Sequence, residues 1–228
     1  MFSVNPTEDK DHYKLIRISG NILLNKDEYL RYTGLSDSTK YAVLTLADVK
    51  SKLENHPYII KAEVGFDGIN GINAELIEKE PKALILKNNK FNFITKAGEL
   101  LPVINQNMVA GYPIISNLKK DRKNSLNSGE LKSAFRIIDV IKSVDKSMYA
   151  SLAEINLRNG GDILLMFSGF PFPVIFGKKN EARKILALKT IRDELLKHNG
   201  KIFSIEYIDL IYKNKIFIGE RKITELKG

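Results

Sequence analysis

The chain of 228 residues can hold one large domain or two small ones, and its 43% hydrophobic and 28% charged residues are typical of a folded soluble protein. It has no cysteine, which excludes disulfides, thiolate metal sites and a thiol nucleophile, and its longest apolar run is far shorter than the roughly 20 residues that span a bilayer. The net charge of +9 favours acidic partners, but the basic residues are spread out and are densest at "LKKDRKNS" (118–125), which disfavours a nucleic-acid groove.

The first 80 residues carry three strand patterns, with two helix patterns between the first strand and the second. After a polar lead-in that we expect to be flexible, capping residues, glycine stops and apolar spacing predict a strand at 13–20, helices at 25–34 and 45–57, and strands at 58–64 and 72–78. The loop "GFDGING" (65–71) between the last two strands resembles a phosphate-binding loop in its glycines. Such a loop requires a helix after it, whereas an alternating strand follows, so we predict a hairpin.

Beyond Pro81 the pattern changes to short strands with two helices. Strands are predicted at 83–87, 91–94, 97–104, 172–177 and in a hairpin at 151–167 that turns at Asn159-Gly160-Gly161. Residues 116–129 are predicted to be a solvated loop. The two helices begin near Ser128 and Asn180, and their buried faces are predicted to hold Leu131, Phe135, Ile138 and Ile141 in the first and Ile185, Leu188, Ile191 and Leu195 in the second. We therefore expect an α+β fold.

The polar residues give no sign of catalytic, metal or cofactor chemistry. We interpret the three histidines, His12, His56 and His198, as surface or helix-capping groups. The candidate acids Asp48, Glu63, Asp67, Asp162 and Asp209 are scattered singly, and none forms an acid/base couple. Asp209 interrupts an apolar strand, and we expect it to face outward.

The closing stretch "IEYIDLIYKNKIFIG" (205–219) predicts two strands around Lys213-Asn214. Ile216, Phe217 and Ile218 are all apolar, so this strand needs cover on both faces. A last strand, however, lies at the open edge of a sheet, where an unpaired apolar strand invites another chain. Ile216, Phe217 and Ile218 therefore either complete a core or bind a partner.

Six motifs follow one another along the chain: "IRISGNILLNKDEYLRYTGL", "LTLADVKSKLENHPYIIKAEV", "IEKEPKA", "KAGELLPVI" with "YPIIS", "VIFGKKNEARKILAL" and "YIDLIYKNKIFIG". In this order, over about residues 13–219, they resemble the bacterial cell-division family FtsQ, called DivIB in many lineages. The first 80 residues resemble its POTRA domain. The chain departs from the family at Ile211, where arginine is usual, and at Thr95, where an acid is often found.

The resemblance implies a β-α-α-β-β POTRA domain at 13–80 and a mainly antiparallel β domain with two flanking helices at 81–220. Residues 1–12 would be the lead-in and residues 221–228 a charged tail. It also implies a non-enzymatic divisome scaffold without cofactor, located outside the cytoplasmic (inner) membrane at the division septum. The family's cytoplasmic tail and single membrane helix are not found in the sequence, so we expect a truncated chain.

The partners that the resemblance implies are FtsB-like and FtsL-like division proteins, held by β-strand addition to the last strand. The predicted partner site is the turn and strand Tyr212, Lys213, Asn214, Lys215, Ile216, Phe217, Ile218 and Gly219. The POTRA domain is expected to contact other division proteins through a surface that includes Lys50 and Lys61. Through these contacts the scaffold would link early and late division proteins and regulate septal peptidoglycan synthesis.

Two other functions remain open on the sequence. A POTRA-containing module of outer-membrane biogenesis would have several POTRA repeats or many alternating strands of a β-barrel, and neither pattern is present. A basic nucleic-acid-binding protein would lose affinity for DNA or RNA steeply with salt. A membrane helix encoded upstream would dismiss the nucleic-acid alternative.

Overall fold

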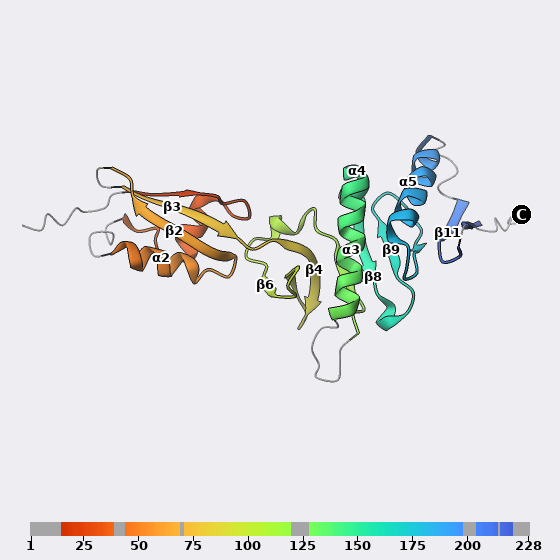
Figure 1. The fold of residues 1–228 in the computed structure, drawn as a ribbon, viewed down its shortest axis with the longest axis horizontal. Helices are drawn as coiled ribbons and strands as arrows, with labels where there is room; N and C mark the ends of the chain where they lie inside the picture. The colour runs from red at the N-terminus through yellow and green to blue at the C-terminus, as the bar shows by residue number, and fades with distance from the viewer. Residues whose placement is uncertain are drawn as a thin grey trace, which may run out of the picture. The chain divides into compact units, whose positions relative to one another are not determined.

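The computed structural model describes residues 15–38, 44–68, 71–119, 128–197, 204–213 and 215–220, and His12, His198 and Asn214 lie outside them. The chain divides into two compact units, Met1–Glu80 and Pro81–Gly228. Both units combine helices with a sheet (Figure 1), so the predicted α+β class is confirmed. In the residues that the structure describes, we find no helix that is both long and apolar enough to cross a membrane.

The first unit has the predicted order of elements. Its strands and helices are β1 (Leu15–Ser19), α1 (Lys26–Tyr32), α2 (Leu46–Glu54), β2 (Ile59–Phe66) and β3 (Gly71–Glu78). The sheet order is β1-β3-β2, with β1 parallel and β2 antiparallel to β3. The glycine-rich loop therefore lies between the strands of a hairpin, as the sequence predicts.

Both helices of this unit begin at the capping residues that the sequence predicts. Asn25 and Thr45 each accept the backbone N–H of the residue three positions on, and the side chains of Glu28 and Asp48 return the bond to the cap. Helix α2 ends at Glu54, three residues before Pro57. The caps thus locate the starts of the helices to within one residue.

His56 is buried in the first unit, so its interpretation as a surface or capping group is wrong. Its side chain is only 1% exposed, and its ring centroid lies 4.7 Å from that of Tyr29, 4.3 Å from that of Tyr32 and 5.2 Å from that of Tyr58. Nδ1 accepts the backbone N–H of Tyr58 at 3.1 Å. Nε2 is buried and has no hydrogen-bond partner. The pKa of His56 is lowered to about 4, first by burial and then by the charge of Lys79.

The second unit is built on one sheet. Its strands are β4 (Pro81–Lys87), β5 (Lys90–Thr95), β6 (Leu100–Pro102), β7 (Ile114–Ser116), β8 (Leu152–Asn156), β9 (Leu164–Phe167), β10 (Val174–Ile175), β11 (Ile205–Asp209) and β12 (Phe217–Glu220). The sheet order is β12-β11-β10-β9-β8-β7-β4-β5-β6. Five of these eight pairings are antiparallel, so the sheet is mainly antiparallel, as expected.

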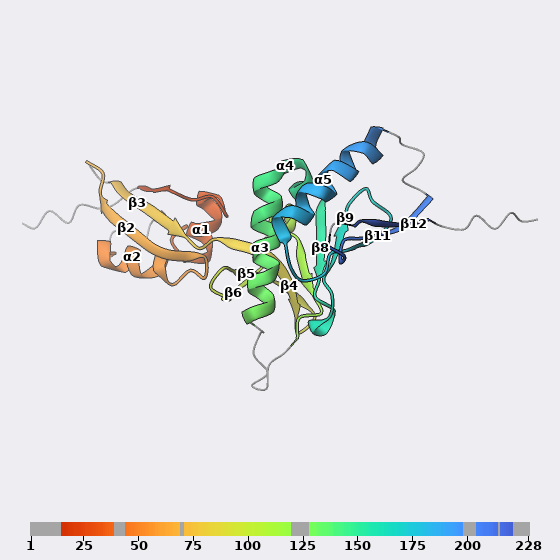
Figure 2. The same ribbon diagram turned by 45° about the vertical axis from the view of Figure 1, so that its right-hand side comes forward.

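Helices α3 (Ser128–Val144) and α5 (Glu181–Lys197) lie against one face of this sheet, as Figures 1 and 2 show, and a short helix α4 (Lys146–Ser151) follows α3. The four predicted apolar positions of α3 are buried in one cluster, together with Ile185 and Leu188 of α5 and with inward residues of the sheet. Ile191 and Leu195 are partly buried against the same cluster. The predicted apolar faces of both helices therefore pack against the sheet.

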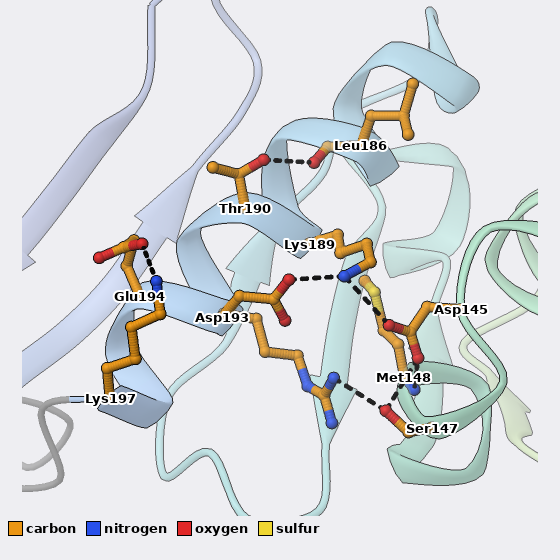
Figure 3. Close-up of polar contacts among 10 residues, drawn as sticks. Asp145, Ser147, Met148, Leu186, Lys189, Thr190, Asp193, Glu194 and Lys197 are labelled. Atoms are coloured by element: carbon orange, nitrogen blue, oxygen red, sulfur yellow. Dashed lines mark hydrogen bonds and ion pairs between the residues drawn. The ribbon is translucent and has the colours of Figure 1, made fainter.

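An ion-pair network connects α5 to the start of α4 (Figure 3). Lys189 Nζ lies 2.5 Å from Asp193 Oδ2 and 3.4 Å from Asp145 Oδ2. Asp145 caps α4 by accepting the backbone N–H of Met148 at 2.8 Å. This bond, with the Ser147 hydroxyl and Lys189, lowers the pKa of Asp145 to about 2. The network helps to fix the position of α5, whose first turns lie beside the end of β11.

Candidate functional site

Strand β12 is the last strand of the nine-stranded sheet, at the end opposite β6. It pairs with β11, and no other described strand lies beside it (Figure 2). The register aligns Tyr207 with Gly219, Ile208 with Ile218 and Asp209 with Phe217. One side of β12 therefore faces β11 and its other side is an open edge of the described sheet.

The hydrogen bonds of β11 show which backbone groups of β12 point outward. The N–H of Ile208 donates to Pro173 O at 3.1 Å and that of Leu210 to Ile175 O at 2.8 Å, so both residues face β10. Backbone groups alternate sides along a strand, so Asp209 and Tyr207 face β12 and pair with Phe217 and Gly219. The N–H and C=O of Ile218 consequently point away from the sheet, where they can bond another strand.

The side chains along this edge are apolar and exposed. Tyr212 and Phe217 form a T-shaped pair with ring centroids 5.1 Å apart, and their side chains are 57% and 46% exposed. Ile218 stands opposite Ile208, which is 1% exposed, yet Ile218 itself is 45% exposed because it is on the outermost strand. Ile216 is also exposed. The edge thus offers an apolar contact surface beside unpaired backbone groups.

Gly219 is required by close packing within the pair of strands. A Cβ atom at this position would lie 2.3 Å from Cε1 of Tyr207, because the tyrosine ring of β11 crosses over the glycine. Aromatic rings commonly cover glycines on a neighbouring strand. Gly219 was predicted as a partner contact, and the structure gives it a clear role in seating β12 on β11.

Replacing Gly219 by valine is expected to displace either the Tyr207 ring or β12 itself. A substitution that forces such a shift typically lowers the free energy of unfolding by about 1–3 kcal/mol. Amide exchange along β12 should become faster, measured by NMR against Gly98→Val as control. A Cβ at Gly98 meets no neighbouring atom; a valine there is strained by the φ of +83°, which Gly219 does not share, so the control is destabilised away from β12. Unchanged exchange along β12 in Gly219→Val would contradict this packing role.

A small basic cavity of about 220 Å³ adjoins the turn before β12. Its lining combines apolar residues with four cationic side chains, and the residues are Asn180, Arg183, Lys184, Ala187, Leu210, Ile211, Tyr212, Lys213, Lys215 and Ile216. Lys184 is half-buried, donates to Phe176 O at 2.6 Å, and has a lowered pKa because of burial. The cavity can accept an acidic or apolar side chain.

The structure brings most of the predicted partner residues together and adds two. Tyr212, Lys213, Lys215 and Ile216 form the turn, and Phe217 to Gly219 lie on β12. Arg183 and Lys184 come from α5, about 30 residues earlier in the chain, and they were not among the predicted partner residues. The basic character of the first helical turn was visible, but its position beside the last strand depends on the tertiary fold.

Lys50 and Lys61 belong to the first unit and are exposed. Lys50 on α2 lies 3.9 Å from Glu54, and Lys61 on β2 lies 2.6 Å from Glu63. Both pairs are at the surface, where ion pairs contribute little to stability. The two lysines are therefore free to exchange these carboxylates for those of another protein.

Comparison with known proteins identifies a family, and a relative whose similarity extends along most of this chain. The model of the family described as FtsQ/DivIB, C-terminal related, matches residues 80–218, which include the first two residues of β12. The chain is also 21% identical over 223 residues to the cell division protein FtsQ of Syntrophotalea carbinolica (strain DSM 2380 / NBRC 103641 / GraBd1). That similarity covers 96% of this chain and 77% of the relative.

Proposed function

Because the chain belongs to the FtsQ/DivIB family of cell-division proteins, we propose that it is a non-enzymatic scaffold that holds FtsB-like and FtsL-like proteins through β12. The observation that carries this proposal is the open edge, where the backbone groups of Ile218 point outward beside exposed Phe217 and Tyr212. Main-chain hydrogen bonds supply affinity in strand addition, and side-chain contacts supply specificity.

The basic cavity supports the same proposal and specifies the partner further. It is continuous with the edge, because Tyr212, Lys213, Lys215 and Ile216 line it. A segment paired with β12 that extends past Ile216 reaches Arg183 and Lys184. We therefore expect the partner segment to carry an acidic residue just beyond its strand, where charge complementarity raises the rate of association.

The cellular setting follows from the same proposal. A scaffold of this kind is held in the cytoplasmic membrane by a single helix, with the region described here outside that membrane at the septum. The first unit serves as the POTRA domain and contacts other division proteins, and the second serves as the β domain. Recruitment through both units connects early and late division proteins and regulates septal peptidoglycan synthesis.

The Phe217→Ala variant tests the site on β12. We expect it to weaken binding of the FtsB-like partner by about 2 kcal/mol, as the loss of an aromatic anchor does. The loss of unfolding free energy should stay at about 1 kcal/mol, because about half of the residue is already exposed. Phe91→Ala on β5 is the matched control, since Phe91 is 45% exposed, close to the 46% of Phe217. If Phe217→Ala unfolds, the ring belongs to the core. If it folds and binds normally, the ring lies outside the interface.

Charge reversal at Lys50 and Lys61 tests the proposed POTRA surface. The double variant Lys50→Glu/Lys61→Glu should reduce recruitment of the chain to the septum, because glutamates at these two positions would repel an acidic partner surface. Localisation is measured with a fluorescent fusion of the full-length protein. Lys87→Glu/Lys90→Glu, at the exposed turn between β4 and β5, makes the same change in net charge and should localise normally. Normal localisation of the Lys50/Lys61 variant would remove this surface from the proposal.

A further inference from the structure

The hairpin of β4 and β5 carries two unusual pairs of side chains beside its turn. The register places Leu86 opposite Phe91, and these residues are 60% and 45% exposed. The next pair toward the turn is Lys87 with Lys90, and both lysines are exposed. Opposite residues of an antiparallel pair share a face of the sheet, and successive residues alternate between faces. One face of this hairpin tip is therefore apolar and the other is basic.

Neither pair stabilises the chain by itself. Like charges directly opposite each other in a sheet are destabilising, and Lys87 and Lys90 form no ion pair with another described residue. Leu86 and Phe91 leave about half of their surface in water. The pairs are nevertheless held in place by a tight turn. Its central residues, Asn88 and Asn89, have φ values of 51° and 58°, as the type I′ hairpin turn requires.

The surroundings of the hairpin tip add positive charge. Strands β4, β7 and β8 are parallel, so the exposed Lys119 and Arg158, which follow β7 and β8, lie at the same end of the sheet as the tip (Figures 1 and 2). A groove of about 990 Å³ connects the tip to these strand ends. Among the described residues that line it, Glu154 is the one acid, and its carboxylate accepts a hydrogen bond from the Ser116 hydroxyl. This end of the sheet therefore favours an anionic partner.

We propose that the tip of the β4–β5 hairpin docks on the surface of an anionic bilayer. The apolar pair enters the boundary between headgroups and acyl chains, and the lysines on the other face reach the surrounding phosphates with their long side chains. A soluble polyanion would pair with the lysines but would leave Leu86 and Phe91 in water, so the combination favours a bilayer. Docking orients the second unit on the membrane. It is separate from partner binding at β12 and from recruitment to the septum.

A tryptophan reporter on the full chain locates the docking surface, because the chain has no tryptophan of its own. Phe91→Trp is titrated with vesicles of phosphatidylglycerol and phosphatidylcholine in equal parts, and with vesicles of phosphatidylcholine alone. Its emission should shift to the blue, and brominated acyl chains should quench it, with the anionic vesicles only. Phe217→Trp, on β12 and 46% exposed in the parent, is the matched control and should keep its emission. An equal shift in both variants would overturn the assignment to the hairpin.

The basic pair is tested by sedimentation of the chain with the same vesicles. Lys87→Gln/Lys90→Gln should weaken partition onto anionic vesicles about thirtyfold, the effect of two basic residues close to the surface. The net charge of +9 attracts the whole chain to such vesicles, so a control with the same loss of charge is needed. Lys142→Gln/Lys146→Gln, at the opposite end of α3 and at the start of α4, should partition nearly as the parent does. Equal losses in the two double variants would contradict a specific site.

The apolar pair distinguishes a bilayer from a soluble polyanion. Leu86→Ala/Phe91→Ala should weaken partition onto anionic vesicles about tenfold, because less apolar surface leaves water. Its binding to heparin, a soluble polyanion, should equal that of the parent. If the variant partitions onto vesicles as the parent does, or if the parent binds both kinds of vesicle equally, the proposal is wrong.

Binding of the FtsB-like partner to β12 is measured in the same variants and should be unchanged, because the altered side chains are exposed at another part of the sheet. Urea unfolding of each variant confirms that the second unit is folded. Failure to bind vesicles with normal binding at β12 therefore refutes this inference and leaves the proposed function intact.

Discussion

The Ile218→Pro variant is expected to abolish binding of the FtsB-like partner while the second unit stays folded. The N–H of Ile218 points away from β11, so removing it breaks no hydrogen bond of the isolated sheet. Proline cannot donate to a ladder, and on an edge strand with its nitrogen outward it is tolerated. Binding by calorimetry and unfolding by urea, measured on the same protein, separate the two effects.

Phe217→Pro is the matched variant on the inward side. Phe217 pairs with Asp209, so proline there removes a bond between β11 and β12, and we expect it to destabilise the end of the sheet. Ile216 has the same outward parity as Ile218 but precedes β12, so Ile216→Pro should weaken binding with less effect on folding. If Ile218→Pro and Phe217→Pro have the same effects on binding and on stability, the assignment of the outward side is wrong.

Acidification is expected to destabilise the first unit through His56. The imidazole pKa is about 4 in the folded protein against an ordinary value of 6.5. The neutral ring is thus favoured by folding, so its contribution is complete above pH 6.5 and is lost as the pH falls toward 4. The shift corresponds to a loss of about 3 kcal/mol of unfolding free energy between these limits.

The surroundings of His56 explain this direction. Tyr29 and Tyr32 of α1 and Tyr58 before β2 surround the ring, and no carboxylate bonds its buried Nε2. The charge of Lys79 acts on the ring and repels a proton. Glu78 is held by the Tyr29 hydroxyl at 2.5 Å and by the N–H groups of Ile22 and Leu23 at 2.9 Å. A charged imidazolium would therefore be buried without a partner.

The measurement compares urea unfolding of the first unit, followed by its NMR signals, in the parent and in His56→Phe between pH 7 and 4. Carboxylates that titrate in this range affect both proteins, so the difference between the two curves isolates the histidine. His56→Phe loses the acceptor for the N–H of Tyr58 and is expected to be less stable at pH 7. If the parent and the variant lose stability in parallel as the pH falls, His56 is not the cause of the acid destabilisation.

Local signals predicted most of the fold. Asn25 and Thr45 satisfy backbone groups within a single helical turn, so their side chains and spacing suffice to locate α1 and α2. The apolar faces of α3 and α5 follow from helical periodicity alone. Helix α4 was missed because a helix of six residues has no apolar period to detect, and it begins directly after α3.

What the sequence could not supply is the set of contacts between distant segments. His56 is buried because tyrosines of α1 close over it, and nothing within a few residues of it indicates this. The cations of α5 join the turn before β12 only through the tertiary fold. Resemblance and position identified the last strand as the candidate site, but its outward side required the register with β11.

The most direct test of the central claim is amide exchange at Ile218 in the presence and absence of the FtsB-like partner. In the free protein the N–H of Ile218 should exchange fast, while that of Phe217, bonded toward β11, is protected. Saturating partner should slow exchange at Ile218 and leave Phe217 nearly unchanged, because a new strand bonds only the outward groups. Fast exchange at Ile218 in the fully bound protein would contradict strand addition at β12.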